Sequence, residues 1–443
     1  MSEPADFVID ARWVIPVEPA GSVLEHHSVA VRNGEIAAIL PAVEARQRFR
    51  AGEIVSLENH ALLPGFVNAH THAAMTLFRG LADDLPLMDW LQHHIWPAEA
   101  KWVGEEFVRA GTELAMAEMI KGGTTCFNDM YFFADVTARA AETAGLRAVV
   151  GLIVLDFPSA WAQNADEYLH KCLRLHDELR HSPHVHTAFA PHAPYTVSDG
   201  PLEKIVTYAE ELGLPVHMHV HETAHEVSES ETHHGVRPLE RLARLGLLGP
   251  RFMAVHMTQL LPAEIAAAAR QNLSVVHCPA SNLKLASGFC PVQKLMEAGI
   301  NVALGTDGAA SNNNLDMLKE LQLAALLAKG VAGSATALPA HQALAMATLN
   351  GARALGLDDR IGSLKPGKAA DLIAIDLSAV ATEPVYDPTS QIVYACSRDQ
   401  VTDVWVAGQR LLKSRELVTL DESAIRAQAH GWRDKIFTAN QRS

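Results

Sequence analysis

Apolar and polar positions alternate with two different periods along the middle of this chain. Short apolar runs are separated by stretches such as residues 105–122, in which apolar residues recur three and four positions apart, as on a helix face. Strands that alternate with helices are typical of a parallel sheet with crossover helices. We predict eight strands: Gly65–His70, Thr124–Met130, Ala148–Leu155, Val185–Pro191, Val216–Val220, Phe252–Met257, Leu273–Cys278 and Asn301–Thr306. Eight strands over roughly 300 residues predict a (β/α)8 TIM barrel.

The two ends of the chain show shorter apolar runs separated by turn signals. Asn33-Gly34 and Ala407-Gly408 are such signals between strand-like segments. Neither end has enough strands for a stable sheet by itself, so we expect one small composite β-sandwich domain built from both ends. The expected division is 1–62 and 363–420 for this β-domain, 63–362 for the barrel and 421–443 for a C-terminal helix.

Charge and cysteine content narrow the class of protein. The net charge of −15 opposes a nucleic-acid-binding surface, because phosphate requires a basic footprint. No run approaches the ~20 apolar residues of a membrane span, and the N-terminus lacks the basic region of a signal peptide. The five cysteines are scattered without CxxC spacing. We therefore expect a cytoplasmic enzyme with reduced cysteines and no membrane partner.

Histidines and carboxylates stand at or just past the ends of several predicted strands. The set comprises His70-Thr71-His72, His219 to Glu222, His256 and Asp307. A parallel β/α barrel gathers the carboxyl ends of its strands on one face. Three neutral imidazoles and one carboxylate would form a divalent-metal site with a position left for water. The pattern predicts a metal-dependent hydrolase.

The spacing His-x-His is not diagnostic in a chain with 23 histidines, so position must select the ligands. His70 and His72 follow a strand and point to the same side, because side chains alternate along a strand. For the third ligand, His217, His219 and His221 share one parity. We favour His219, since a glutamate follows it three residues later; His217 then packs the barrel, and His221 faces the rim or the substrate.

His256 and Asp307 each have an ordinary structural alternative. A histidine at the end of a strand can be a core residue, and a lone aspartate there can cap a loop or a helix. Opposite three histidines, however, Asp307 fits a metal ligand and a base, and His256 fits a catalytic group.

Longer motifs carry a resemblance to a known family. LPGFVNAHTH, HVHE, AVHM and LGTDG occur in this order and resemble the amidohydrolase superfamily. HTHAAMTLFRGLADDLPLMDWLQHHIWPAEA, HAPYTVS, HCPASNLKL and TDGAASNNNLDML resemble more closely its deaminases of adenosine derivatives, which act on methylthioadenosine and S-adenosylhomocysteine. The resemblance covers nearly the whole chain.

The resemblance implies a mononuclear site. Two-metal members carry a bridging carboxylated lysine at the end of the fourth strand, but here that strand, HVHTAFAPHAPY, contains no lysine. We therefore expect one Zn²⁺ per subunit; iron and manganese remain alternatives. The expected ligands are His70, His72, His219 and Asp307.

The implied reaction is hydrolytic deamination of an adenine ring. Asp307 would accept a proton from the attacking water, and His256 would hydrogen-bond the attacking oxygen. Glu222 would protonate N1 as the oxygen adds at C6 and would later help to transfer a proton to the leaving amine. The products would be the inosine analogue and ammonia.

The substrate contacts rest on the resemblance. Glu99 falls where similar deaminases place a carboxylate for the ribose hydroxyls, and His192 where they place a histidine near the same sugar. Trp90 would form an apolar wall beside the nucleoside, and Ser311 would touch the base. A core tryptophan and a solvated glutamate are the plain alternatives for Trp90 and Glu99.

One loop of this sequence lacks a cationic residue that deaminases acting on S-adenosylhomocysteine need, and this bears on substrate specificity. The loop LDFPSAWAQNADEY, after the third strand, has no Arg or Lys for the carboxylate of a homocysteine group, and it offers Phe157, Pro158, Trp161 and Ala162 instead. We therefore favour 5′-methylthioadenosine over S-adenosylhomocysteine, although Arg79 or a neighbouring subunit could supply a cation.

Two other functions stay open from the residues. The same site chemistry serves triazine chlorohydrolases and guanine or pterin deaminases, and a barrel without activity could act as a scaffold. The scaffold is disfavoured because no expected ligand is missing. The expected partner is a small-molecule nucleoside, and a homo-oligomer, a dimer or a tetramer, follows from the general preference of soluble enzymes.

Overall fold

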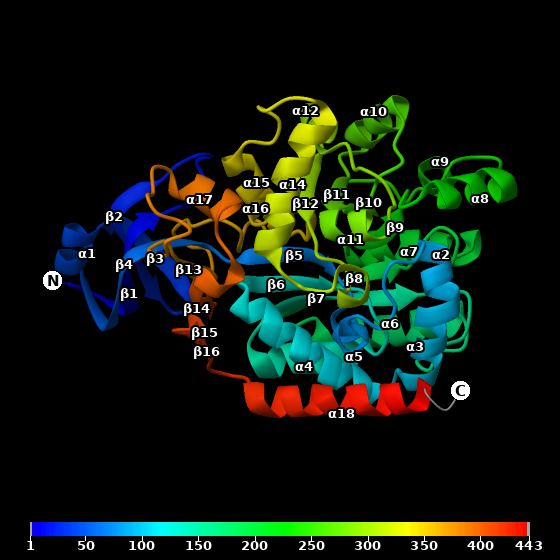
Figure 1. Ribbon diagram of the computed structural model, residues 1–443, viewed down its shortest axis with the longest axis horizontal. Helices are drawn as coiled ribbons and strands as arrows, with labels where there is room; N and C mark the ends of the chain where they lie inside the picture. Colours follow the sequence, from blue (N-terminus) through cyan, green and yellow to red (C-terminus); the bar gives the residue numbers. More distant parts are fainter. Residues whose placement is uncertain (1, 441–443) are drawn as a thin grey trace.

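The computed structural model describes residues 2–440 and contains two eight-stranded sheets (Figure 1). The barrel sheet has parallel strands in the order of the chain. Its strands are β5 (Phe66–Thr71), β6 (Thr124–Asp129), β7 (Arg147–Val154), β8 (Val185–Pro191), β9 (Val216–Val220), β10 (Phe252–His256), β11 (Ser274–His277) and β12 (Asn301–Leu304). All eight predicted strands are confirmed, with ends within two residues. Strands such as β7 are buried throughout, as parallel strands covered by helices must be.

Helices follow the strands and form the outer layer of the barrel (Figure 1). They are η1 (Ala73–Phe78), α2 (Leu87–Trp90), η2 (Leu91–Ile95), α3 (Trp96–Trp102), α4 (Glu105–Lys121), α5 (Ala134–Ala144), α6 (Ala165–Leu179), α7 (Asp199–Leu212), α8 (Ala224–His234), α9 (Pro238–Arg244), α10 (Pro262–Gln271), α11 (Pro279–Lys284), α12 (Val292–Glu297), α13 (Ala309–Asn312), α14 (Met317–Ala332), α15 (Ala340–Met346) and α16 (Leu349–Ala354). The segment α2–η2–α3 lies between the first strand and its long crossover helix α4. It is an insertion at the face where the strands end.

The seam between the first and last barrel strands is joined by hydrogen bonds at the level of the candidate ligands. The backbone N–H of Asp307 donates to the carbonyl of His70 at 3.0 Å, and the N–H of Thr306 donates to Oδ1 of Asn68 at 3.0 Å. The chain segments that carry His70 and Asp307 are therefore neighbours although they lie more than 200 residues apart.

The second sheet combines both ends of the chain, as the composite β-domain predicted. Its order is β16-β15-β14-β13-β4-β1-β2-β3, with β4 paired to β1 in parallel and to β13 in antiparallel fashion. The strands are β1 (Glu3–Val14), β2 (Leu24–Arg32), β3 (Glu35–Pro41), β4 (Phe49–Pro64), β13 (Leu372–Asp376), β14 (Val401–Val406), β15 (Gln409–Lys413) and β16 (Glu416–Leu417). The helices of this part are α1 (Ala42–Arg48), α17 (Pro388–Tyr394) and η3 (Arg398–Gln400).

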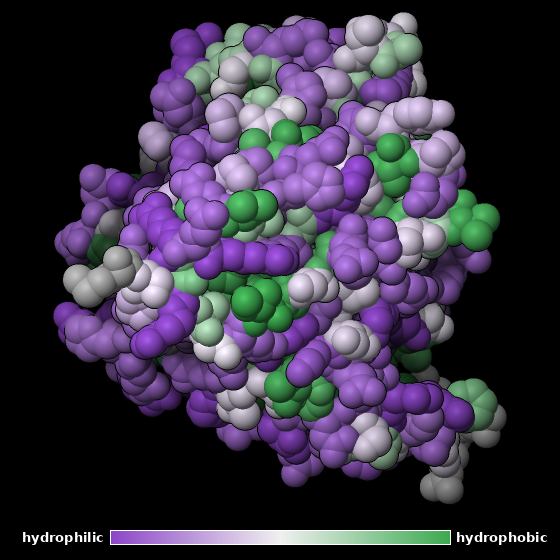
Figure 2. Space-filling model, turned by 90° about the vertical axis from the view of Figure 1, so that its left-hand side faces the viewer, coloured by the Kyte–Doolittle hydropathy of each residue, from purple (hydrophilic) through white to green (hydrophobic). Residues whose placement is uncertain are grey.

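The β-domain has a core of its own and one buried ion pair toward the barrel. Phe7, Ile9 and Trp405 belong to an apolar cluster separate from the main barrel core. Arg147, at the start of β7, donates two hydrogen bonds to Asp371, just before β13, at 2.9 and 3.1 Å. The outer end of this domain is mostly hydrophilic, with apolar side chains in small separate groups (Figure 2).

A long C-terminal helix, α18 (Glu422–Asn440), returns from the β-domain and lies along α4 (Figure 1). Its Trp432 packs edge-on against Phe107 of α4, with ring centroids 5.2 Å apart. Ile436 is buried in the same apolar cluster as Trp90. Within residues 2–440, no helix combines the length and apolar character that crossing a bilayer requires.

Candidate metal centre and active site

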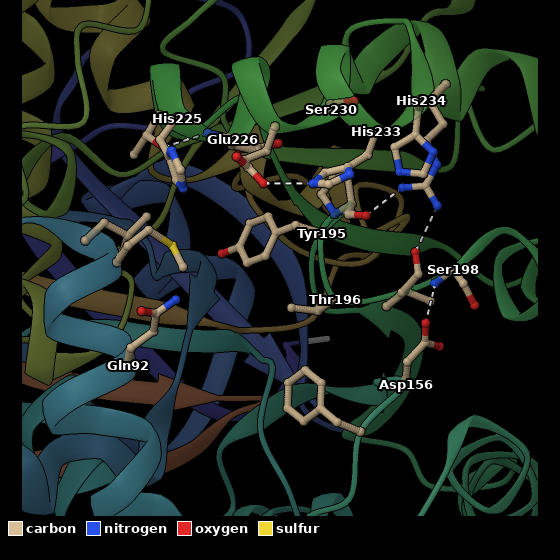
Figure 3. Close-up of a pocket in the computed structure, with 18 of the residues that line it drawn as sticks. Gln92, Asp156, Tyr195, Thr196, Ser198, His225, Glu226, Ser230, His233 and His234 are labelled. Atoms are coloured by element: carbon tan, nitrogen blue, oxygen red, sulfur yellow. Dashed lines mark hydrogen bonds and ion pairs between the residues drawn. The ribbon is translucent and has the colours of Figure 1, made fainter.

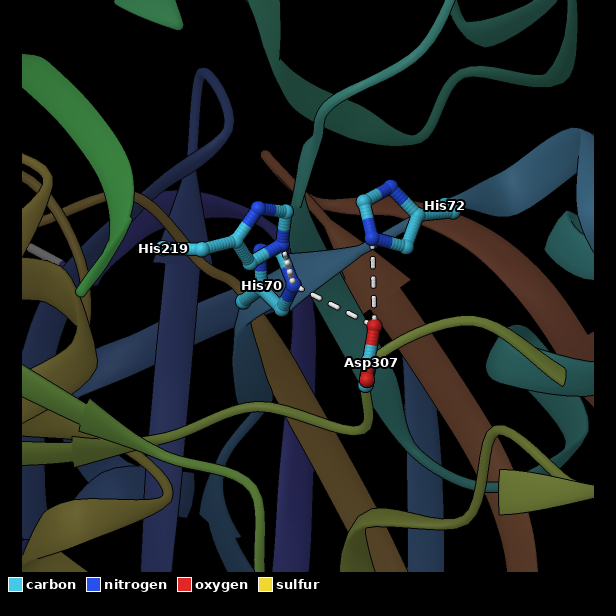
Figure 4. A group of neighbouring side chains, drawn as sticks. All are labelled: His70, His72, His219 and Asp307. Atoms are coloured by element: carbon cyan, nitrogen blue, oxygen red, sulfur yellow. Dashed lines mark hydrogen bonds and ion pairs between the residues drawn. The ribbon is translucent and has the colours of Figure 1, made fainter. Parts of the chain in front are cut away.

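Four side chains meet at the carboxyl ends of the barrel strands. They come from β5, the residue after it, β9 and the loop after β12, and their possible ligand atoms all lie within 4.8 Å of one another (Figure 4). Oδ1 of Asp307 lies 3.3 Å from Nε2 of His70 and 3.1 Å from Nε2 of His72, and Nε2 of His219 lies 3.2 Å from that of His70. Three imidazole nitrogens and one carboxylate oxygen that converge in this way suit a zinc ion.

Partners on the far side of the rings turn the Nε2 atoms toward the centre. Nδ1–H of His72 donates to the carbonyl of Met130 at 2.6 Å, and Nδ1–H of His219 donates to the carbonyl of His192 at 2.7 Å. Nδ1 of His70 lies 2.8 Å from Nε2 of His217. Such outer contacts fix ring orientation at metal sites. His217, expected to pack the barrel, is buried and touches a ligand without being one.

Burial controls the charge of two of the three histidines. It lowers the pKa of His70 to about 4 and holds the pKa of His219 well below its ordinary range, so both rings stay neutral. At His72, burial acts in the same direction, but the hydrogen bond to Asp307, the negative charges of Asp307 and Asp129 and the hydrogen bond to Met130 together outweigh it and raise the pKa to about 9. A proton and a metal ion therefore compete for Nε2 of His72.

Both carboxylate oxygens of Asp307 have hydrogen-bond partners. Burial opposes its ionisation, but the hydrogen bonds with His70 and His72 keep the pKa of Asp307 well below its ordinary value. Its second oxygen, Oδ2, accepts hydrogen bonds from the hydroxyls of Ser281 at 2.6 Å and Ser311 at 2.8 Å. Ser281 was not predicted individually, although it lies in the HCPASN segment that carries the resemblance.

Glu222 and His256 face each other beside this group. Nδ1–H of His256 donates to Oδ1 of Asn282 at 2.8 Å, which directs Nε2 toward Glu222, 3.8 Å from its Oε2. Burial raises the pKa of Glu222, so this carboxyl group can hold a proton at higher pH than an exposed one. His256 and Asp307 both have positive φ angles, 75° and 59°, a strained backbone state that clusters at functional sites.

Glu226 is a further residue of this site that the sequence reasoning missed. Its carboxyl oxygens accept hydrogen bonds from the backbone N–H groups of His221 at 2.9 Å and Glu222 at 2.7 Å. Burial raises the pKa of Glu226 to about 8. The spacing Thr223-x-x-Glu226 is a helix-capping signal that could have identified Glu226. The two hydrogen bonds of Glu226 fix the turn that presents Glu222.

One cavity of about 90 Å³ gathers the predicted substrate-facing residues around the metal group. Glu99 accepts a hydrogen bond from the hydroxyl of Tyr131 at 2.7 Å, and burial raises the pKa of Glu99 to about 7. Trp90 is buried, and its indole Nε1 has no hydrogen-bond partner among the described residues. The predicted residues that line the cavity are His72, Trp90, Glu99, His192, His219, Glu222, His256, Asp307 and Ser311.

The loop after β7 contributes fewer residues to the lining of this cavity than expected. Only Phe157 of its four apolar candidates lines the cavity, whereas Trp161 and Ala162 are buried in the barrel core and Pro158 is exposed. Arg79, the possible cation, pairs with Glu118 and also donates to the carbonyl of Asn313. It is therefore not positioned to bind a substrate carboxylate in this cavity.

Comparison with known proteins agrees with this geometry. The model of the amidohydrolase family matches residues 61–411. A 5-methylthioadenosine/S-adenosylhomocysteine deaminase of Teredinibacter turnerae is 53% identical over 431 residues, which cover 97% of this chain and 98% of that protein. A 5′-deoxyadenosine deaminase of Methanothermobacter thermautotrophicus is 44% identical over 380 residues, 85% of this chain and 87% of that protein. An adenosine deaminase from Xanthomonas campestris, solved with bound zinc, has a TM-score of 0.98 and 56% identity, covering 99% of this chain and 100% of that one.

Proposed function

This chain belongs to the amidohydrolase family, and from that premise we propose that it is a zinc-dependent deaminase of 5′-methylthioadenosine. The proposal extends to S-adenosylhomocysteine and adenosine as weaker substrates. The observation that carries it is one cavity in which Glu222, His256 and Glu99 lie beside His72, His219 and Asp307 of the His-His-His-Asp group. Glu99 is half-buried beside the groups that act on the ring. A carboxylate at this place can bind ribose hydroxyls, so it favours a nucleoside over guanine, a pterin or a triazine.

His70, His72, His219 and Asp307 would hold the zinc ion, which when bound brings the pKa of a water molecule toward about 7 and so supplies a nucleophile at neutral pH. Asp307 would accept a proton from the attacking water: its Oδ2 is fixed by two serine hydroxyls, and its Oδ1 faces the histidines of the metal group. The carboxylate is in the ionised state that a base requires.

Glu222 and His256 complete the proton transfers in the proposal. Glu222 donates a proton to N1 of adenine as oxygen adds at C6. As the C6 carbonyl forms, Glu222 takes up the proton that the C6 hydroxyl loses and helps to transfer the proton held by Asp307 to the leaving amine. His256 hydrogen-bonds the attacking oxygen through Nε2, and Asn282 keeps its ring in place. General acid–base help of this kind contributes roughly 10²–10⁴-fold to the rate.

The remaining predicted residues bind the nucleoside in this proposal. Glu99 accepts hydrogen bonds from the ribose hydroxyls, and His192 lies near the same sugar. Trp90 forms an apolar wall, and Ser311 touches the base while it supports Asp307. Ammonia release by the zinc-loaded protein tests the whole assignment, with methylthioadenosine, S-adenosylhomocysteine, adenosine and guanine in parallel. We expect the highest kcat/KM for methylthioadenosine; release from guanine alone would contradict the proposal.

Three points about the whole protein are also part of the proposal. We place the division of the chain at 1–62 and 363–420, 63–362 and 421–443. We propose a homo-oligomer, a dimer or a tetramer, which light scattering after size-exclusion chromatography tests. We place the enzyme in the cytoplasm, since all five cysteines are free and four are buried.

A further inference from the structure

A second, larger cavity adjoins the catalytic one. It measures about 500 Å³, against about 90 Å³ for the inner cavity, and ligand pockets are typically ~300–1,000 Å³. Leu87, Trp96, Phe157 and Tyr195 line both cavities and form a collar between them. The aromatic rings of Trp96 and Phe157 approach to 6.0 Å between centroids across this collar. The inner cavity alone is too small for a nucleoside with a 5′ substituent, so the ligand must extend outward.

The direction of the substituent follows from the chemistry of adenine. C6 of the ring must lie at the metal group, beside Glu222 and His256, for the deamination proposed above. The 5′ position is at the opposite end of a nucleoside, so its substituent points through the collar into the outer cavity. This step rests on the proposed function.

The outer cavity presents acidic groups without a free strong cation among its described lining residues. Asp156 is exposed there and accepts a hydrogen bond from the backbone N–H of Ser198 at 2.7 Å (Figure 3). Glu229, on α8, is half exposed and lies 3.1 Å from the ring of His233. His225 and His234 are the other imidazoles of this wall, and burial lowers the pKa of His234.

Arg241 is the single arginine of the lining, and its hydrogen-bonding directions are occupied. It is buried, its Nε donates to Asp199 at 2.8 Å, and its two terminal nitrogens donate to the carbonyls of Pro194 at 2.5 Å and Val197 at 3.0 Å. Arg241 therefore lines the cavity with its nitrogens engaged by Asp199 and by the loop that carries Tyr195. A carboxylate in the outer cavity would meet Asp156 and Glu229 without a bidentate partner.

We propose that the outer cavity is the subsite for the 5′ substituent and that it selects by charge. Thioether substituents that are neutral or cationic pass the apolar collar and are accepted, and anionic ones are disfavoured. The charges involved are largely exposed, so the discrimination is modest, about fivefold for roughly 1 kcal/mol.

Substrates that differ only in the end group of the substituent test this subsite. We would compare kcat/KM for the 5′-methylthio, 5′-propylthio, 5′-(3-aminopropyl)thio and 5′-(2-carboxyethyl)thio derivatives of adenosine at pH 8. The expected result is similar values for the first three and a value at least about fivefold lower for the carboxylate.

A charge reversal on α8 tests the subsite a second time, and a charge reversal elsewhere on the same helix is its matched control. Glu229→Lys should raise the ratio of carboxyethyl to methylthio turnover by about fivefold, whereas Glu231→Lys, an exposed position of the same helix outside the lining, should leave that ratio unchanged. Equal use of the carboxylate and the amine, or equal effects of the two lysine variants, would overturn the subsite. Absence of deamination of all four compounds and of adenosine would instead refute the deaminase assignment on which the subsite depends.

Discussion

Glu222 has two contacts that bear on its proton. Its backbone N–H is held by Glu226, and its carboxyl group lies 3.8 Å from the ring of His256 in a buried position. Burial raises its pKa, which favours the protonated form that a proton donor to N1 of the base requires. For activity, the ionisable carboxyl group of Glu222 should therefore matter more than the size of its side chain.

Replacement of Glu222 by glutamine keeps the size and removes the proton. We expect Glu222→Gln to lower kcat by about 10²–10⁴-fold, because N1 loses its proton donor, with the zinc content unchanged. Steady-state ammonia release and metal analysis of the same preparation measure the two quantities. Glu203→Gln, at an exposed position of α7, serves as the control. Full activity in zinc-loaded Glu222→Gln would exclude the proton-transfer role.

At the scale of elements, α14 ties together the two short helices beside the metal group. Oε2 of Glu320, on α14, accepts the backbone N–H of Ala280 at 3.1 Å, and Oε1 accepts Nδ2 of Asn312 at 2.8 Å. These contacts hold α11, which carries Ser281, and α13, which carries Ser311. No pattern in the sequence indicated this role, because an isolated glutamate in a helix is ordinarily a solvated residue.

The stability of the fold should depend on pH through Glu320. Burial raises its pKa to about 8, above the unfolded value near 4.5. Between these values the unfolded chain binds fewer protons than the folded one, so the contribution of Glu320 to stability is greatest at low pH and decreases as pH rises to about 8. Glu320→Gln does not titrate. Its Tm relative to the natural protein should therefore be higher at pH 8 than at pH 5, whatever its offset; a Tm difference independent of pH would contradict this.

At the scale of the whole molecule, the metal group connects distant strands of the barrel. His70 and His72 come from the first strand and its end, His219 from the fifth, and Asp307 from the loop after the eighth, across the seam. A zinc ion bound to all four would link both sides of that seam. Ligands that bind only the folded state stabilise it by mass action.

Removal of zinc should therefore lower both activity and stability. We expect about one zinc ion per chain by metal analysis, a lower Tm after chelation, and recovery of Tm and ammonia release with one equivalent of zinc. In His219→Ala the response of Tm to zinc should be lost, and in His170→Ala, an exposed position, it should be kept. Two zinc ions per active site would refute the mononuclear assignment.

Much of this protein was determined by the sequence itself. Buried parallel strands require continuous apolar runs, and the eight runs between residues 63 and 362 gave the strands of the barrel within two residues. The expected ligands His70, His72 and Asp307 could be chosen because strand parity and strand ends restrict where a side chain can point. His219 was favoured over His217 and His221, which share its parity, because a glutamate follows it three residues later. The long motifs added the family, which charge and spacing alone would not have supplied.

Only the tertiary structure decided which residues support and surround these groups. Ser281 and Glu320 make hydrogen bonds with segments 26 and 40 residues away, and such pairings leave no periodic pattern in the chain. Glu226 binds a backbone N–H only four residues away, but only the structure places that turn beside the metal group. Trp161 looked like a substrate contact but is core, and Arg79 looked like a free cation but is paired. Burial and hydrogen-bond partners are properties of the packed chain, so the outer cavity and its charge became visible only there.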